Sequence, residues 1–262
     1  MTNKEINISF SPHPRIDAQD FLVIKKVNDS CDTLGLAINL DMKNKLGLED
    51  IGEEVTCLIV NIIKERYLKE HIEKKYKSNY RDELELIYTF SLTVFDRMEN
   101  MIRDIIMKKA YNYLEEYSYM NIDGFLRFRL KEIYTYLSSI SEIGLEKYLE
   151  EKEQSEFINV LKYFIDMQES RIDLLIVNIL DNGSFKLYDK DGNKVDNIDD
   201  EDIISMAIKE DLNYGDFLIS TLLALCPNEI KIIDYLNDES SKVVIETIKS
   251  IFEERVSITI KK

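Results

Sequence analysis

Over residues 1–47 the spacing of apolar residues changes from alternating to helical and back to alternating. Apolar and polar residues alternate over 5–10, which predicts a half-buried strand. Apolar residues three or four positions apart over 17–34 predict a helix, and a second alternation over 36–40 predicts another strand. We therefore expect residues 1–47 to form a small N-terminal β-α-β unit.

A helical period dominates the middle of the chain, residues 48–170. Its apolar stripes are wider than the seam of a two-stranded coiled coil, so they predict a bundle of long helices. A break is expected at Ser78-Asn79, and the sequence from Asn121 to Gly124 is typical of a turn or a helix N-cap. The predicted helices cover residues 48–68, 84–105, 125–137 and 143–167.

Strand and turn signals return over residues 171–262. A β-hairpin is expected first, because Asp181 to Ser184 separates two short apolar runs. A strand-helix-strand passage long enough for a parallel crossover is expected at the end. The predicted elements are strands at 174–180, 185–188, 230–233 and 256–260, and helices at 202–209, 216–225 and 241–252.

The fold class that these patterns predict is α+β and predominantly helical. The predicted regions are 1–47, 48–170 and 171–262. The pattern leaves open whether the N- and C-terminal strands share one sheet, in which case the chain would be one compact domain.

Composition supports long helices and excludes several classes of protein. Glycine (8) and proline (3) are scarce among the 262 residues, so few helix breakers are present. The net charge of −16 disfavours general binding to nucleic acids or anionic membranes. Apolar runs are too short to span a membrane, and three scattered cysteines suggest reduced thiols. Since the N-terminus also lacks a signal-peptide core, we expect a cytoplasmic protein without membrane insertion.

Residues for familiar catalytic chemistry are few. His13 lies between two prolines, and His71 lies on a helix among charged residues, where we expect it to be solvated. No phosphate-binding glycine loop, nucleophile elbow or zinc-type cysteine spacing is present. Asp189 to Gly192 resembles part of a calcium loop, but Ile198 occupies the place of the bidentate glutamate, so a hairpin turn is favoured. We expect no metal and no cofactor, and the sequence identifies no catalytic residue.

Two basic stretches are candidates for binding. Residues 64–81 hold seven Lys or Arg against three Glu, but Glu65–Lys69, Glu70–Lys74 and Glu73–Lys77 have the spacing of helix-stabilising ion pairs. A solvated helix face is therefore favoured over a nucleic-acid site. The second stretch combines cations with aromatic residues, as protein interfaces often do. Its candidate partner-binding residues are Phe125, Arg127, Phe128 and Arg129, and one of the phenylalanines is expected to be partly exposed.

Several segments in a fixed order resemble the YtxC-like sporulation proteins of endospore-forming Firmicutes. The resemblance covers nearly the whole chain and is strongest from about residue 81 onward. It implies a role in sporulation but no activity, cofactor or catalytic residue, so no residue role is carried over. The segments are 124–130 (GFLRFRL), 151–158 (EKEQSEFI), 161–165 (LKYFI), 216–223 (DFLISTLL), 226–227 (CP) and 255–258 (RVSI).

Three functions remain open at this point. The favoured hypothesis is a non-enzymatic interaction or scaffold protein of the sporulating cell, with one or more protein partners. The first alternative is an enzyme of unrecognised type with a pocket between helices and sheet. The second is a weak nucleic-acid binder that uses the basic face of residues 64–81.

Overall fold

The computed structural model describes residues 5–11, 25–30, 33–39, 48–195 and 214–260, with side chains at 6–11, 51–195 and 214–260. It confirms a predominantly helical α+β fold. The chain divides into two compact units, Met1–Glu151 and Lys152–Lys262. The boundary between them falls inside one long helix, α5 (Glu132–Met167).

The first unit contains a four-stranded sheet with the strand order β2-β3-β1-β4. Antiparallel pairing joins β1 to β3 and β3 to β2, and β4 lies parallel to β1 on the other side. The strands are β1 (Glu5–Phe10), β2 (Lys25–Ser30), β3 (Thr33–Asn39) and β4 (Tyr119–Asn121).

The prediction of a helix over residues 17–34 is wrong for the part of that range that the structure describes. Residues 25–30 form β2, and Ser30 pairs with Thr33 of β3, so a hairpin replaces the helix. Asn28, Asp29 and Ser30 have low helix propensity and favour turns, which outweighs the helical spacing of the apolar residues. The strand predicted at 36–40 overlaps β3, which ends at Asn39.

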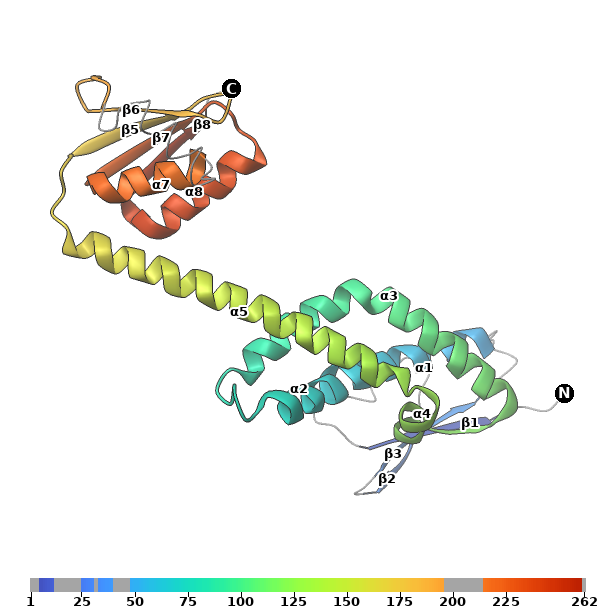
Figure 1. Cartoon of the computed structure of the whole chain (residues 1–262). Helices are drawn as coiled ribbons and strands as arrows, with labels where there is room; N and C mark the ends of the chain where they lie inside the picture. The colour runs from blue at the N-terminus through green and yellow to red at the C-terminus, as the bar shows by residue number, and fades with distance from the viewer. Residues whose placement is uncertain (1–4, 12–24, 31–32, 40–47, 196–213, 261–262) are drawn as a thin grey trace. The chain divides into compact units, whose positions relative to one another are not determined.

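Three helical segments follow one another without a break after residue 48. They are α1 (Leu48–Ile62), the π-helical segment η2 (Ile63–Leu68) and α2 (Lys69–Tyr76). The predicted break at Ser78-Asn79 is confirmed, and α3 (Leu84–Glu116) begins after it. Helices α1 and α3 pack against each other and contribute nearly half of the buried residues of the first hydrophobic core (Figure 1).

The bounds of helix α4 (Ile122–Arg129) and of α5 differ from those of two predicted helices. The side chain of Asn121 caps α4 by accepting a hydrogen bond from the amide of Gly124 at 2.8 Å, which confirms the N-cap signal. The helix predicted over 125–137 is interrupted at Leu130, and the one predicted over 143–167 begins already at Glu132. The turn signal thus located the start of α4, whereas nothing comparable marked the short break after it.

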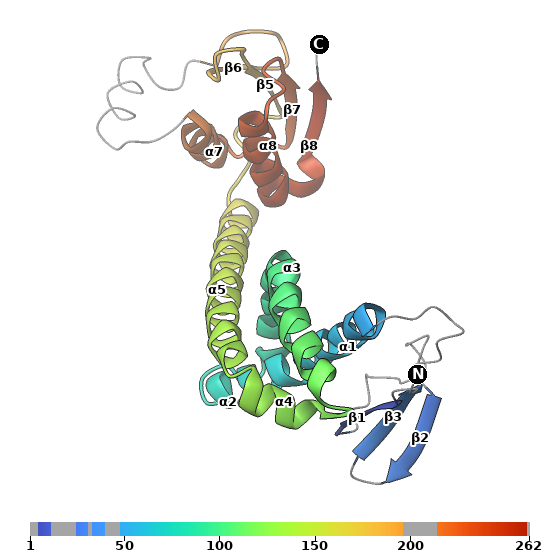
Figure 2. The ribbon, with the colours of Figure 1, turned by 90° about the vertical axis from the view of Figure 1, so that its right-hand side faces the viewer.

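The second unit has its own four-stranded sheet, with the order β6-β5-β7-β8. The predicted hairpin and parallel crossover are both confirmed, because β5 and β6 are antiparallel while β7 is parallel to β5 and β8. Helices α7 and α8 cover one face of this sheet (Figures 1 and 2). The elements are β5 (Leu174–Ile179), β6 (Phe185–Tyr188), α7 (Tyr214–Leu225), β7 (Glu229–Asp234), α8 (Glu239–Phe252) and β8 (Val256–Ile260).

The described strands therefore belong to two sheets, so the N- and C-terminal strands do not share one. The helix predicted over 202–209 lies outside the described residues. None of the helices in the described part of the chain combines the length and the apolar character that crossing a membrane requires.

Candidate functional site

The four predicted partner-binding residues lie on α4 but face two sides of it. Phe125 is buried, with its ring edge-on to Tyr113 at 5.5 Å, and Arg129 stacks over that same tyrosine at 5.4 Å. Arg127 and Phe128 instead line a pocket, and Phe128 is 68% exposed. Phe128 is therefore the exposed phenylalanine, while Phe125 contributes to the core.

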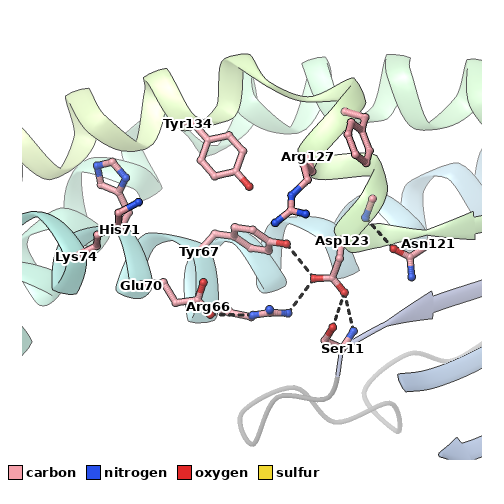
Figure 3. Close-up of a pocket in the computed structure, with 12 residues that line it drawn as sticks. Ser11, Arg66, Tyr67, Glu70, His71, Lys74, Asn121, Asp123, Arg127 and Tyr134 are labelled. Atoms are coloured by element: carbon pink, nitrogen blue, oxygen red, sulfur yellow. Dashed lines mark hydrogen bonds and ion pairs between the residues drawn. The ribbon is translucent and has the colours of Figure 1, made fainter. Parts of the chain in front are cut away.

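This pocket has a volume of about 660 Å³ and lies entirely within the first unit. Its walls come from Ser11 after β1, from the η2–α2 segment, from α4 and from the start of α5 (Figure 3). The sequence brings these elements together because Asn121 ends β4 beside β1 and also caps α4. The lining residues are Ser11, Arg66, Tyr67, Glu70, His71, Lys74, Asn121, Asp123, Gly124, Arg127, Phe128 and Tyr134.

Asp123 holds one side of the pocket together. Its Oδ2 accepts hydrogen bonds from the backbone amide and the hydroxyl of Ser11, both at 2.8 Å. Its Oδ1 accepts from the Tyr67 hydroxyl and from Nη1 of Arg66, both at 2.9 Å (Figure 3). Burial opposes ionisation of Asp123, but the donors from Ser11 and Tyr67 and the charge of Arg66 outweigh it and lower its pKa. This carboxylate is committed to internal contacts and stays ionised at neutral pH.

The two tyrosines of the pocket stay protonated. Burial and the hydrogen bond to Asp123 raise the pKa of Tyr67 far above its ordinary value. Burial is also the main cause of the raised pKa of Tyr134, whose ring lies edge-on to Tyr67 with the centroids 6.1 Å apart. Both hydroxyls therefore act as neutral hydrogen-bonding groups.

Three cations and two carboxylates line the pocket. Arg66 is bound on both sides, to Asp123 and to Glu70 at 3.0 Å. Lys74 and Arg127 are exposed and form no hydrogen bond or ion pair with any described residue. Figure 3 shows the Arg127 guanidinium directed toward Tyr67, with no marked interaction. The pocket thus keeps two cations available for an anionic group.

His71 departs from the solvated environment expected for it. It is half-buried in the wall of the pocket, and its Nε2 atom is enclosed without a hydrogen-bond partner among the described residues. Burial, followed by the charge of Lys75, lowers the pKa of the imidazole, which is therefore neutral at physiological pH. Packing of α2 beside α5 encloses the ring, as the hydrogen bond from Lys75 to Ser138 illustrates.

The π-helical segment η2 is a feature that the sequence pattern did not predict. Such segments are rare and often occur at functional sites, because they shift the helix face that follows. Here η2 carries Arg66 and Tyr67, and both reach the same carboxylate on α4. The apolar stripe continues through η2, which is why periodicity alone predicts an ordinary helix at this position.

The basic stretch 64–81 is largely neutralised by ion pairs. Five of its seven cations bind carboxylates, so little positive charge remains for a phosphate backbone. Of the predicted i,i+4 pairs, Glu73–Lys77 is present, whereas Lys69 binds Glu85 on α3 and Glu70 binds Arg66. The paired cations are Lys64, Arg66, Lys69, Lys75 and Lys77.

Acidic residues form no metal site within the described ranges, where no three His, Cys, Asp or Glu side chains are suitably grouped. The turn at Asp189 is a hairpin turn, as predicted. Its carboxylate accepts hydrogen bonds from the amides of Asp191 and Asn193 at 2.9 and 2.8 Å.

Comparisons with known proteins agree with the resemblance seen in the sequence. The chain is 28% identical over 142 residues to the uncharacterized protein YtxC of Bacillus subtilis (strain 168). This match covers 52% of the chain and 47% of the relative, about half the length of each. No solved structure matches the chain. The YtxC-like family matches residues 49–257, which is most of the chain, and this protein therefore belongs to the YtxC-like family.

Proposed function

We propose that this protein is a non-enzymatic interaction protein, and that its pocket receives a carboxylate of an acidic protein segment. The observation that carries the proposal is that Lys74 and Arg127, which line the same pocket as the exposed ring of Phe128, form no ion pair or hydrogen bond with any described residue. Carboxylates and guanidinium groups form strong charge-assisted hydrogen bonds. A segment bound there gains both an ionic anchor and an apolar contact.

The exposed aromatic ring favours a protein ligand over a small anion. A small anion is too small to cover the ring of Phe128, which is 68% exposed. A peptide extends beyond the pocket and can cover the ring, and arginine and aromatic residues are enriched in protein interfaces. Because the whole chain carries a charge of −16, an acidic partner is not attracted at long range, so recognition depends on these short-range contacts.

The pKa directions in the pocket favour binding over acid-base catalysis. A catalytic acid or base needs a pKa near the working pH. Here the pKa of Asp123 is lowered and those of Tyr67 and Tyr134 are raised, so all three are held in their usual protonation states. The alternative of an enzyme is supported by His71, whose neutral imidazole has a nitrogen without a hydrogen-bond partner among the residues that the structure describes.

We place this role in the sporulating cell, as the resemblance to YtxC-like sporulation proteins implies. A cytoplasmic location is part of the proposal. It is supported by the free thiols of Cys57 and Cys226, which suit a reducing compartment.

The test is a titration of the full-length protein with short, terminally blocked peptides that pair Glu or Asp with an apolar residue. We expect saturable binding that perturbs the NMR signals of Arg127 and Phe128. Reversing the charge with R127E should weaken binding at least about tenfold, since one charge-assisted hydrogen bond contributes roughly 1.5–3 kcal/mol. Arg97→Glu is the matched control, because Arg97 is an exposed cation of the same unit away from the pocket.

Two results would contradict the proposal. One is an absence of saturable binding to any acidic peptide. The other is binding of acetate or phosphate as tight as that of the peptides, with no effect of Phe128→Ala, which would identify a small-anion site. Turnover of a small molecule that requires His71 would favour the enzyme instead.

A further inference from the structure

The last turns of α5 expose an unusual number of apolar side chains. Five of them are between 49% and 71% exposed, although soluble helices normally present polar residues to solvent. Their spacing of three, four and seven residues places them on one helix face about 120° wide. We call this face the α5 stripe, and it consists of Phe157, Val160, Tyr163, Phe164 and Met167.

The opposite side of the same turns is anchored in the second unit. Ile158, Leu161 and Ile165 pack into its hydrophobic core. The charged residues of these turns also face that side, since Lys162 binds Glu253 and Asp166 lies 3.9 Å from Arg255. The α5 stripe is therefore left without charge along its length, which marks an interaction surface.

We infer that the α5 stripe binds the same stripe of a second copy of this chain, in an antiparallel arrangement. Antiparallel pairing centred near Lys162 places Phe157 opposite Met167 and Val160 opposite Phe164. Tyr163 then lies close to the symmetry axis. The stripe is thus complementary to itself, as a two-fold interface requires.

Charge at the N-terminal end of the stripe decides the direction. Glu153 and Glu156 lie on the same helix face, just before Phe157. Parallel helices would bring each glutamate against its own counterpart, which is unfavourable. Antiparallel helices instead place Glu153 beyond the end of the partner helix, away from its own counterpart.

The size of the stripe suits a dimer of modest affinity. An aromatic side chain has roughly 200 Å² of surface, so the exposed parts of the five residues amount to about 500 Å² per copy. A pair of stripes buries about 1,000 Å², the lower limit for a specific interface. Dimerisation should therefore depend on concentration within the micromolar range. This inference does not depend on the function of the pocket.

Sedimentation equilibrium of the full-length protein tests the inference. We expect a shift from monomer to dimer between low and high micromolar concentrations. Phe164→Glu should weaken dimerisation at least about a hundredfold, because it buries two unpaired carboxylates across the axis. Val243→Glu is the control, because Val243 is an exposed apolar residue of α8 in the same unit and should leave the dimer intact. Circular dichroism shows whether both variants remain folded.

Thiol cross-linking tests the direction of the helices. With a rise of 1.5 Å per residue, the two copies of residue 163 are offset by about 3 Å along the helix, and those of residue 156 by about 18 Å. A short bismaleimide should therefore link Tyr163→Cys dimers and not Glu156→Cys dimers, relative to the parent protein. A wild-type chain that stays monomeric overturns the inference and points to a different partner for the stripe. Equal cross-linking at both positions overturns the antiparallel arrangement.

Discussion

Several polar contacts of the pocket involve a single carboxylate, that of Asp123. Four donors from Ser11, Arg66 and Tyr67 converge on it, and they join β1, η2 and α4. A carboxylate that is fully engaged in this way contributes to the shape of the pocket rather than to ligand binding. Lys74 and Arg127, which have no such partners in the described part of the chain, are the groups that remain for a ligand.

Replacing Asp123 should therefore change stability and its dependence on pH. The lowered pKa means that the ionised form stabilises the folded state. This stabilisation is fully present above about pH 4, the ordinary pKa of Asp, and is lost as the pH falls through the lower folded value. We expect Asp123→Asn to reduce the free energy of unfolding by about 2 kcal/mol at pH 7 and to flatten its decline in acid.

Urea unfolding at pH 7 and at pH 3 measures both effects. Asp82→Asn is the control, because Asp82 is exposed and has no described partner. If Asp123→Asn lost as much stability in acid as the wild type, the contacts of Asp123 would not be the source of this pH dependence.

At the scale of elements, α3 and α5 approach each other closely at Ser91 and Gly144. A Cβ atom added at Gly144 would lie 2.2 Å from Oγ and 2.7 Å from Cα of Ser91. Ser91 is fully buried, and its hydroxyl donates a hydrogen bond to the carbonyl of Ile87 at 2.7 Å. The Ser91 side chain occupies the space between the two helices, and the absence of a side chain at Gly144 allows them to approach this closely.

We expect Gly144→Ala to reduce the free energy of unfolding by about 1–3 kcal/mol, because the helices must separate. The opposing gain in helix propensity is at most about 1 kcal/mol. Gly52→Ala is the matched control, since its added Cβ meets the flexible end of Met107 at 3.3 Å. Chemical denaturation compares the two variants. If they proved equally stable, the contact would not be tight in solution.

The sequence predicted those elements whose signals are local. The hairpin at Asp181–Ser184, the N-cap at Asn121 and the terminal crossover were all found in this way. Strand β4 was missed because its three residues are too few to establish an alternation. The hairpin of β2 and β3 was missed because its apolar residues also fit a helix.

The sequence predicted only those pocket residues that have informative neighbours along the chain. Arg127 and Phe128 attracted notice through their neighbours in sequence. Arg66 and Asp123 are 57 residues apart, and their contact depends on how η2 and α4 pack. A basic residue within a helix, such as Arg66, and an acidic residue just after an N-cap, such as Asp123, are both common in sequences. Neither residue therefore predicts a contact with the other.

At the scale of the whole molecule, the described residues form two hydrophobic cores, and α5 contributes side chains to both. Side chains early in α5, among them Leu137 and Ile140, belong to the core of the first unit. Side chains late in the same helix, among them Ile165, belong to the core of the second. A helix of 36 residues is thus stabilised by different contacts at its two ends.

Separate cores predict that the two units respond independently to core mutations. Leu137→Ala should destabilise the first unit and Ile232→Ala the second, each by about 2–5 kcal/mol, because both residues are fully buried. Hydrogen exchange measured by mass spectrometry resolves the two effects. Faster exchange should be confined to residues before about 151 in the first variant and after it in the second. Each variant serves as the control for the other. Acceleration throughout the chain in either variant would mean that α5 couples the two cores into one cooperative unit.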